Sequence, residues 1–242
     1  MMSVQPTGLS HINQALHVPI RNYAALLVSL GGSNVRAITL YGAVVAGTFD
    51  PQRHSVRSVL VLESVDLEML RRLAEHGLKL GKARIAAPLV MTAEYIKRSL
   101  DTFPLEMIEI QQQHVAILGE DYFADLSFED AHVRLQCERE LKTILIGLRQ
   151  GLLSTAGRDK LLAHVEVGAT EGLMRTLRGL LWLKGHQAAT PAAEVVAEVE
   201  KIAGRPLPMV RDALGAAHLH RWNEFKVFYE EVAALGKAVD EW

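Results

Sequence analysis

The chain has 242 residues, which leaves room for one large domain or two smaller ones. Hydrophobic residues make up 49% of it and charged residues 22%, a composition typical of a globular protein with a core. The net charge of −2 supplies no basic excess for a phosphate backbone, so nucleic acid is not the expected partner.

The single cysteine, Cys137, excludes an internal disulfide and a cysteine metal site. Its place on an apolar helical stripe predicts a thiol in the core. No apolar run approaches ~18 residues, and no basic segment followed by an apolar one opens the chain. We therefore expect no membrane segment and a cytoplasmic location.

The first half of the chain alternates apolar runs with amphipathic segments. After a weakly patterned arm over residues 1–17, Pro19 begins a predicted helix that ends at Gly31-Gly32. A second predicted helix has its apolar stripe from Leu67 to Leu78 and closes near Gly81, and Thr92 is the candidate N-cap of a short third one. The predicted strands and short apolar runs are Val35–Leu40, Val56–Leu62, Ala83–Met91, Leu105–Ile110 and His114–Leu118. Strands that alternate with helices indicate an α/β domain over residues 18–122.

The second half, residues 123–242, has helical periodicity only. Ser127 and Asp130 resemble a capping box at the start of a long helix that ends near Gly151. A second long helix has its apolar stripe from Leu162 to Leu180. A third helix begins at Thr190-Pro191 and stops at Gly204, a short helix follows Pro206, and the last helix runs from about Arg221 to Val239. This half predicts an all-α bundle.

The most informative stretch is a glycine-containing turn between two apolar runs. The run Ile38–Leu40 leads to the pair Gly42-Ala43, and Gly47 follows five residues later. A polar loop then leads through Ser55 into the second run. Small residues let a backbone approach a ligand closely, and N–H groups in such a turn can hold an anion. The same pattern also describes an ordinary tight turn after a strand.

In the order and spacing of Gly42, Gly47, Ser55 and the following strand, the chain resembles the nucleotidyltransferase superfamily. The signature of that family is a strand, Gly-Ser, a second glycine, a loop and a strand that carries Ser-Asp-x-Asp. The helical half is similar in order and size to the bundle of kanamycin-nucleotidyltransferase-like proteins. The resemblance implies an α/β (α+β) nucleotidyltransferase-fold domain with a mixed sheet, followed by an all-α bundle.

The two aspartates of the signature are absent. In this alignment Val56 and Ser58 stand where the family has acids that hold divalent metal ions, and we expect both to face the cleft toward the bundle. Ala43 replaces the serine that contacts a phosphate. Glu109, or less favourably Glu106, is the remnant of a third carboxylate. Because one carboxylate cannot hold a pair of metal ions, we expect no catalytic residues, no bound metal and no other cofactor.

The resulting hypothesis is a non-catalytic protein with a degenerate site. Its candidate partners are a nucleotide or an anion in the interdomain cleft, a second copy of the chain, or another protein. The alternative is an active transferase that moves a nucleoside monophosphate to a small acceptor, with Mg²⁺ in a site rebuilt from Asp50 and Glu109. The candidate ligand-binding residues are Gly42, Ala43, Gly47 and Ser55.

A third hypothesis concerns the helical half. Arg158 and His164 resemble the arginine-to-histidine signature of HEPN-type ribonuclease bundles, although such a pair also arises readily by chance. His218 and His220 alternate instead of sharing a helical face and have no acidic neighbour, so we expect no metal site there.

Overall fold

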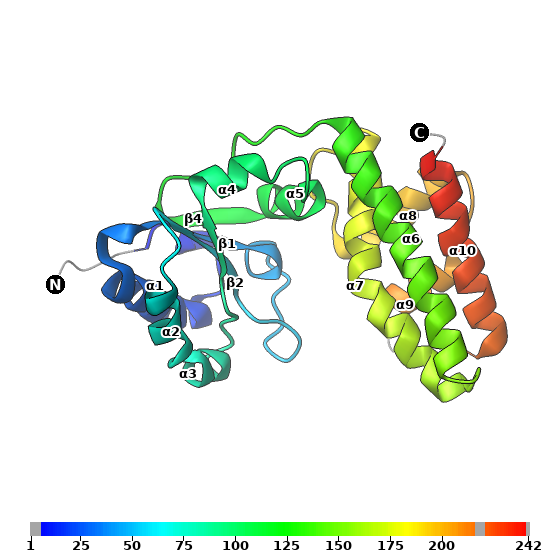
Figure 1. Ribbon diagram of the computed structural model, residues 1–242, viewed down its shortest axis with the longest axis horizontal. Helices are drawn as coiled ribbons and strands as arrows, with labels where there is room; N and C mark the ends of the chain where they lie inside the picture. The colour runs from blue at the N-terminus through cyan, green and yellow to red at the C-terminus, as the bar shows by residue number, and fades with distance from the viewer. Residues whose placement is uncertain (1–5, 216–220, 241–242) are drawn as a thin grey trace. The chain divides into compact units, whose positions relative to one another are not determined.

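The structure, a computed structural model, describes residues 6–215 and 221–240. The chain forms two compact units (Figure 1). The first unit contains the described residues up to Leu100 together with Glu109–Ser127. The second unit contains Asp101–Ile108 and the described residues from Phe128 onward. Domain bounds at 18–122 and 123–242 stay a prediction.

A four-stranded mixed sheet forms the centre of the first unit, with the strand order β3-β2-β1-β4. Its strands are β1 (Val35–Tyr41), β2 (Arg57–Leu62), β3 (Leu89–Thr92) and β4 (His114–Gly119). Strand β1 pairs antiparallel with both β2 and β4, whereas β3 runs parallel to β2. The predicted strand Val35–Leu40 is confirmed, and the short apolar run His114–Leu118 lies in β4.

One face of the sheet packs against the first two helices. The helices of this unit are α1 (His17–Gly31), α2 (Leu67–Ala74), α3 (Gly77–Lys82) and α4 (Ala93–Arg98), with short 3₁₀ turns at Leu9–His11, Gln14–Leu16, Gly32–Asn34 and Gly42–Val44. Tyr23 of α1, Leu40 of β1 and Leu60 of β2 lie in one buried cluster. Leu9 and Ile12 belong to the same cluster, so the described part of the predicted loose arm packs onto the core.

Two predicted elements of this unit are shorter than expected. The predicted strand Ala83–Met91 is reduced to β3, because Pro88 has no N–H to donate to a ladder, and only Ile85 makes an isolated bridge. The helix predicted from Leu67 to near Gly81 is broken into α2 and α3. Thr92 is confirmed as an N-cap, since its hydroxyl accepts from the Tyr95 N–H at 3.1 Å.

The predicted strand Leu105–Ile110 is wrong, because this segment is helix α5 (Pro104–Gln112). Proline is favoured in the first turn of a helix, and its fixed φ starts one here. Leu105, Met107, Ile108 and Ile110 are all buried, which means that apolar side chains surround the helix. Such a short run carries no clear period, and its partial alternation imitates a strand.

The helices of the second unit pack around one apolar core. They are the first part of α5, α6 (Asp130–Ser154), α7 (Asp159–Leu183), α8 (Ala192–Ala203), α9 (Pro208–Gly215) and α10 (Trp222–Asp240). Cys137 is fully buried in this core, and burial raises the pKa of its thiol to about 12. The predicted core thiol is confirmed.

Three helix ends in this unit differ from the prediction. The capping box at Ser127 is not formed, because α6 begins at Asp130 with Glu129 as its N-cap. Helix α6 also continues past Gly151, where a Cβ atom would lie 2.3 Å from Val165 Cγ1 of α7, so this glycine serves close helix packing. Helix α8 begins one residue later than predicted, whereas Gly204 ends it in the left-handed conformation as predicted. None of the helices in the described part of the chain is long and apolar enough to cross a membrane.

Candidate functional site

The direction of the side chains on β2 decides which residues can form a site. Val56 and Ser58 are 0% and 1% exposed and face the core beside α1. The Ser58 hydroxyl forms a 2.9 Å hydrogen bond with the Tyr23 hydroxyl. The expectation that Val56 and Ser58 face a cleft is therefore wrong. Because side chains alternate along a strand, a shift of one residue exchanges the two faces.

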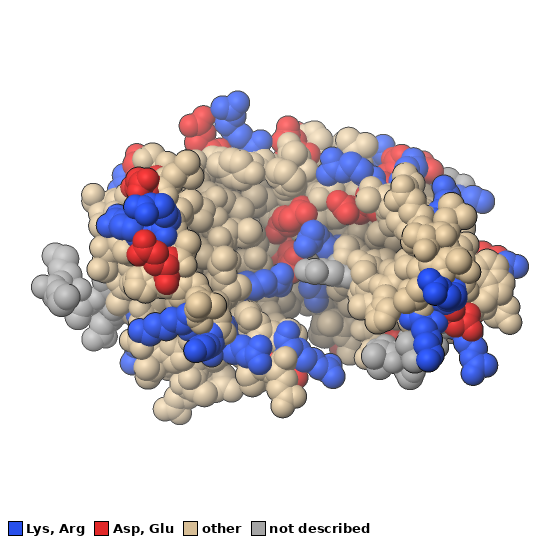
Figure 2. Space-filling view, turned by 60° about the horizontal axis from the view of Figure 1, so that its bottom comes forward, with Lys and Arg blue, Asp and Glu red and all other residues tan. Residues whose placement is uncertain are grey.

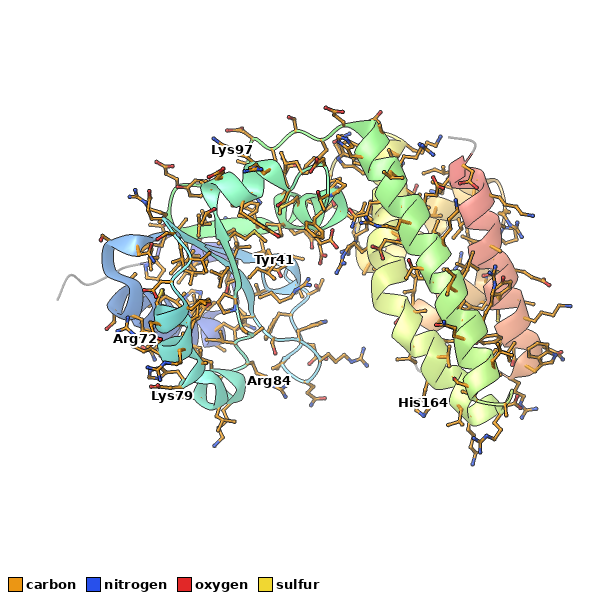
Figure 3. The ribbon with its side chains drawn as sticks, viewed as in Figure 1. Tyr41, Arg72, Lys79, Arg84, Lys97 and His164 are labelled. Carbon is orange, nitrogen blue, oxygen red and sulfur yellow. The ribbon has the colours of Figure 1, made fainter. Side chains whose placement is uncertain are left out.

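Arg57 and Val59 lie on the opposite face of β2. Arg57 is paired in the antiparallel register with Tyr41 of β1, which is labelled in Figure 3. The Arg57 guanidinium lies 4.8 Å from the centre of the Tyr41 ring. The Arg57 Nη2 group donates to Glu109 Oε1 of α5 at 2.7 Å. Val59 is fully buried. The face thus presents an arginine that is held by an aromatic ring and a carboxylate.

The glycine turn follows β1 directly and contacts this arginine. Gly42 has a φ of 75°, and a Cβ atom on it would lie 2.6 Å from Arg57 Nη2. Its N–H donates to Gln113 O, while its carbonyl accepts from the N–H groups of Val45 and Ala46. A residue with a side chain would be both strained and obstructed by Arg57. The glycine is therefore required by the turn and by the close approach of the guanidinium.

The other predicted ligand-binding residues lie along the loop that continues from this turn. Ala43 is half-buried, and its carbonyl accepts from the Thr48 N–H. Gly47 is exposed with a φ of 73°, and Ser55 is exposed immediately before Val56. The structure places these residues on one connected loop.

The carboxylates that could hold a metal ion have partners in different places. Asp50 accepts from the Gln52 N–H within its own loop at 2.8 Å. Glu106 belongs to the second unit, where it pairs with Arg175 at 2.9 Å and accepts from Gln136 at 2.8 Å. Of the carboxylates Asp50, Glu106 and Glu109, only Glu109 pairs with Arg57. Across residues 6–215 and 221–240, no three His, Cys, Asp or Glu side chains form a group that could hold a metal ion. These residues do not fit the pair of divalent ions that the resemblance implies.

A second polar pair lies next to Tyr41 on β4. His114 is paired with Tyr41 in the register, and its Nε2 lies 2.9 Å from the Asp121 carboxylate. Burial raises the pKa of this carboxyl, but the hydrogen bonds from the Phe123 N–H, His114 and the Ala124 N–H outweigh burial and hold it below its usual value.

Basic residues gather elsewhere on the same unit. The segment between Glu75 and Glu94 contains Lys79, Lys82 and Arg84 and no acidic residue, and all three cations are exposed. Figure 2 shows lysine and arginine side chains along one side of this unit with few acidic side chains among them. Arg84 has a φ of 57°, an uncommon value for a residue with a side chain, and its carbonyl accepts from the Val56 N–H at 2.7 Å.

The residues of the ribonuclease hypothesis stand at the start of α7. Arg158 is the N-cap residue of this helix, and its Nε donates to the Thr155 carbonyl at 3.2 Å. His164 is exposed on α7 (Figure 3). The predicted pair His218 and His220 lies outside the described residues.

Comparison with known proteins yields no matching family model and no matching curated protein. Among solved structures, the chain is similar to the spectinomycin adenyltransferase AAD(9) from Enterococcus faecialis, crystallised with ATP and spectinomycin. The TM-score is 0.56 at 10% sequence identity, over 92% of this chain and 98% of that one. The chain has a nucleotidyltransferase-like fold. At this identity the likeness concerns the fold alone, in agreement with the mixed sheet and the helical second part.

Sequence reasoning found the glycine turn of this nucleotidyltransferase-like unit and Glu109, but it missed Arg57, Tyr41 and His114. Arg57 lies between the two residues that were chosen as the altered acids. A signal was present, because an arginine at the start of an apolar strand needs a partner. Glu109 provides that partner.

Proposed function

We propose that this chain is a non-catalytic nucleotidyltransferase-like protein that binds a ligand at the face formed by Tyr41, Arg57 and Glu109. The position of Arg57 carries the proposal, because its guanidinium occupies the strand face beside Gly42 and pairs with Glu109. A nucleotide is the candidate ligand on the basis of the fold, and another protein is the alternative partner.

The charges on this face oppose metal-assisted transfer. In the family that the chain resembles, strand acids hold the metal ions that orient a triphosphate. Here Arg57 places a positive charge on that face, and Val59 offers no oxygen. A guanidinium repels a divalent cation, and here it also pairs with Glu109, the carboxylate that could have been a metal ligand.

The alternative of an active transferase requires two rearrangements. Asp50 would have to leave the Gln52 N–H, and Glu109 would have to leave Arg57. Each step breaks a hydrogen bond to a carboxylate, the stronger class of hydrogen bond in proteins. This cost supports the non-catalytic proposal over the rebuilt site.

The test is a transfer assay on the purified full chain. The chain is incubated with each of the four nucleoside triphosphates, Mg²⁺ or Mn²⁺, and a panel of small acceptors that includes spectinomycin, and pyrophosphate release is measured. AAD(9) serves as the positive control. We expect no release above the level without protein, together with a rise in melting temperature with at least one nucleotide. Release that is lost in the Asp50→Asn and Glu109→Gln variants would establish the transferase instead.

A further inference from the structure

The mismatch between this site and a metal-binding site has a consequence for the kind of ligand that it takes. We propose that the face of Arg57 binds an oxyanion, a phosphate or a carboxylate group, directly on the guanidinium and without a divalent cation. The inference rests on the proposed function, because it names the chemistry of the ligand at that same site.

The guanidinium of Arg57 is held in place and is accessible. The Tyr41 ring lies under it at 4.8 Å, and Glu109 takes one of its N–H groups at 2.7 Å. The Arg57 side chain is 38% exposed, whereas that of Glu109 is 16% exposed. A guanidinium has five N–H donors in a planar fork, and among the described residues only Glu109 accepts a hydrogen bond from it. The remaining edge matches the spacing of two oxygens of a phosphate or carboxylate.

The surroundings also favour an anion. Gly42 leaves open backbone beside Nη2, because it carries no Cβ. The exposed side chain of Arg84 belongs to a residue whose backbone bonds to Val56, directly before Arg57 in the chain. The positive charge of Arg84 adds to that of Arg57 and raises the local potential that attracts anions.

Glu109 has a different role here from the one that it would have in a metal site. In a metal site it would be a ligand, and its neutralisation would abolish binding. In the arginine site it competes with the incoming oxyanion for the same guanidinium. The two models therefore predict opposite effects of Glu109→Gln on ligand affinity. The direction of the effect does not depend on how tightly the natural chain binds the ligand.

The experiment is calorimetric titration of the full chain at low ionic strength with EDTA, with ATP, inorganic pyrophosphate and succinate as separate probes. The phosphate and carboxylate probes distinguish the two sources of the oxyanion. We expect saturable binding of at least one probe that is unchanged by EDTA and weakened by added salt. The Arg57→Gln variant should bind about tenfold more weakly or worse, the effect of losing one charge-assisted contact. Glu109→Gln should bind several-fold more tightly.

The control is Arg36→Gln, because Arg36 and Glu63 form an exposed ion pair at the other end of the β1–β2 pair. This variant should bind as the natural chain does. Arg57→Lys keeps the charge without the planar fork and should have an intermediate affinity. This variant separates a loss of binding in Arg57→Gln from a folding defect. Binding that needs Mg²⁺, binding that is equal in Arg57→Gln, or no binding by the natural chain and by Glu109→Gln would each overturn the inference. None of these results would show transfer activity, so the proposed absence of catalysis is judged separately.

Discussion

On β2, the contact between Ser58 and Tyr23 marks the face of the strand that packs against α1. Burial raises the pKa of Tyr23 to about 12, and the hydrogen bond between the Tyr23 and Ser58 hydroxyls is enclosed by apolar residues of α1 and the sheet. Since Ser58 faces α1, its neighbours Arg57 and Val59 must face the other way. Arg57 and Val59 are therefore on the face of β2 that a ligand could meet.

The sequence predicted the turn at Gly42 and the carboxylate of Glu109, but it could not predict the direction of Arg57. Val59 to Leu62 are buried without interruption, so the strand shows no alternation of polar and apolar residues. Without such alternation, the local pattern does not show which side chains of the strand face the core and which face the other side. The alignment to Ser-Asp-x-Asp placed the serine at Ser55, and the side-chain directions correspond instead to an alignment one residue later.

The first prediction tests this direction through Ser58. Ser58→Ala should destabilise the chain by about 1–3 kcal/mol, because it leaves the buried Tyr23 hydroxyl without a partner. In a double-mutant cycle with Tyr23→Phe, the two changes should cost less together than the sum of each alone, with a coupling of about 1 kcal/mol. Urea unfolding of the full chain measures both quantities.

The control for this cycle is Ser55→Ala, three positions earlier and exposed. It should change stability by less than about 0.5 kcal/mol. If Ser58→Ala were equally neutral and uncoupled to Tyr23, Ser58 would face solvent, and Arg57 would lose its place at the proposed site.

At the scale of elements, the helices of the second half were predicted more accurately than the strands of the first. Long amphipathic stripes, such as that of α7, contain several turns, and each turn repeats the same signal. Helix α5 is short, and both of its sides are buried, so its pattern carried no period that could separate a helix from a strand. The tertiary surroundings decide such a segment, and a single sequence does not show them.

Helix α9 offers a test of how a buried carboxylate supports an element. Glu231 of α10 is 3% exposed and accepts from the Val210 N–H at 2.8 Å and the Met209 N–H at 3.3 Å, at the first turn of α9. Burial raises the pKa of this carboxyl, and the two backbone bonds and Arg205 only partly oppose the shift. The folded chain therefore binds this proton more tightly than the unfolded chain does.

The second prediction follows from the direction of that shift. A raised pKa in the folded state means that the contribution of Glu231 to stability is complete below its unfolded pKa of ~4.3 and is lost as pH rises through the folded value. Glu231→Gln removes this loss. The stability of the variant relative to the natural chain should therefore increase from pH 4 to pH 7, as measured by urea unfolding at several pH values.

Glu198→Gln is the matched control for this pH series. Glu198 lies on α8, and its hydrogen bond to Lys201 lowers the pKa of its carboxyl. A lowered pKa contributes stability that is lost as pH falls, so the relative stability of this variant should change with the opposite sign. If the relative stabilities of both variants changed with pH in the same direction, the assignment of the raised Glu231 pKa to burial would be wrong.

At the scale of the whole molecule, the order of the α/β and helical parts and the mixed sheet were predictable, and the solved AAD(9) structure has the same fold. The sequence did not reveal how the chain is divided. Asp101–Ile108 belongs with the helical unit through the core residues Leu105 and Ile108, although the residues on either side of it belong with the sheet. This exchange depends on packing between distant segments, which local patterns do not report.

The last prediction asks whether the fold can be returned to metal binding by changing the correct strand face. Arg57→Asp with Val59→Asp places two carboxylates on one face of β2 and releases Glu109 from its cation. Without metal, three acids should repel one another and lower stability at neutral pH. Mn²⁺ relieves that repulsion, so it should raise the melting temperature of the variant, by about 5 °C or more at ~100 times its Kd, while the natural chain does not respond. Because Val59 is fully buried, the single variant Arg57→Asp is measured in parallel and should show a smaller rise in the same direction.

The comparison variant is Val56→Asp with Ser58→Asp, which puts the same two charges into the core against α1, where they should destabilise the chain with no response to Mn²⁺. If this comparison variant gained stability from Mn²⁺ and the Arg57 variants did not, Val56 and Ser58 would be the aspartate positions, and the site described at Arg57 would be wrong.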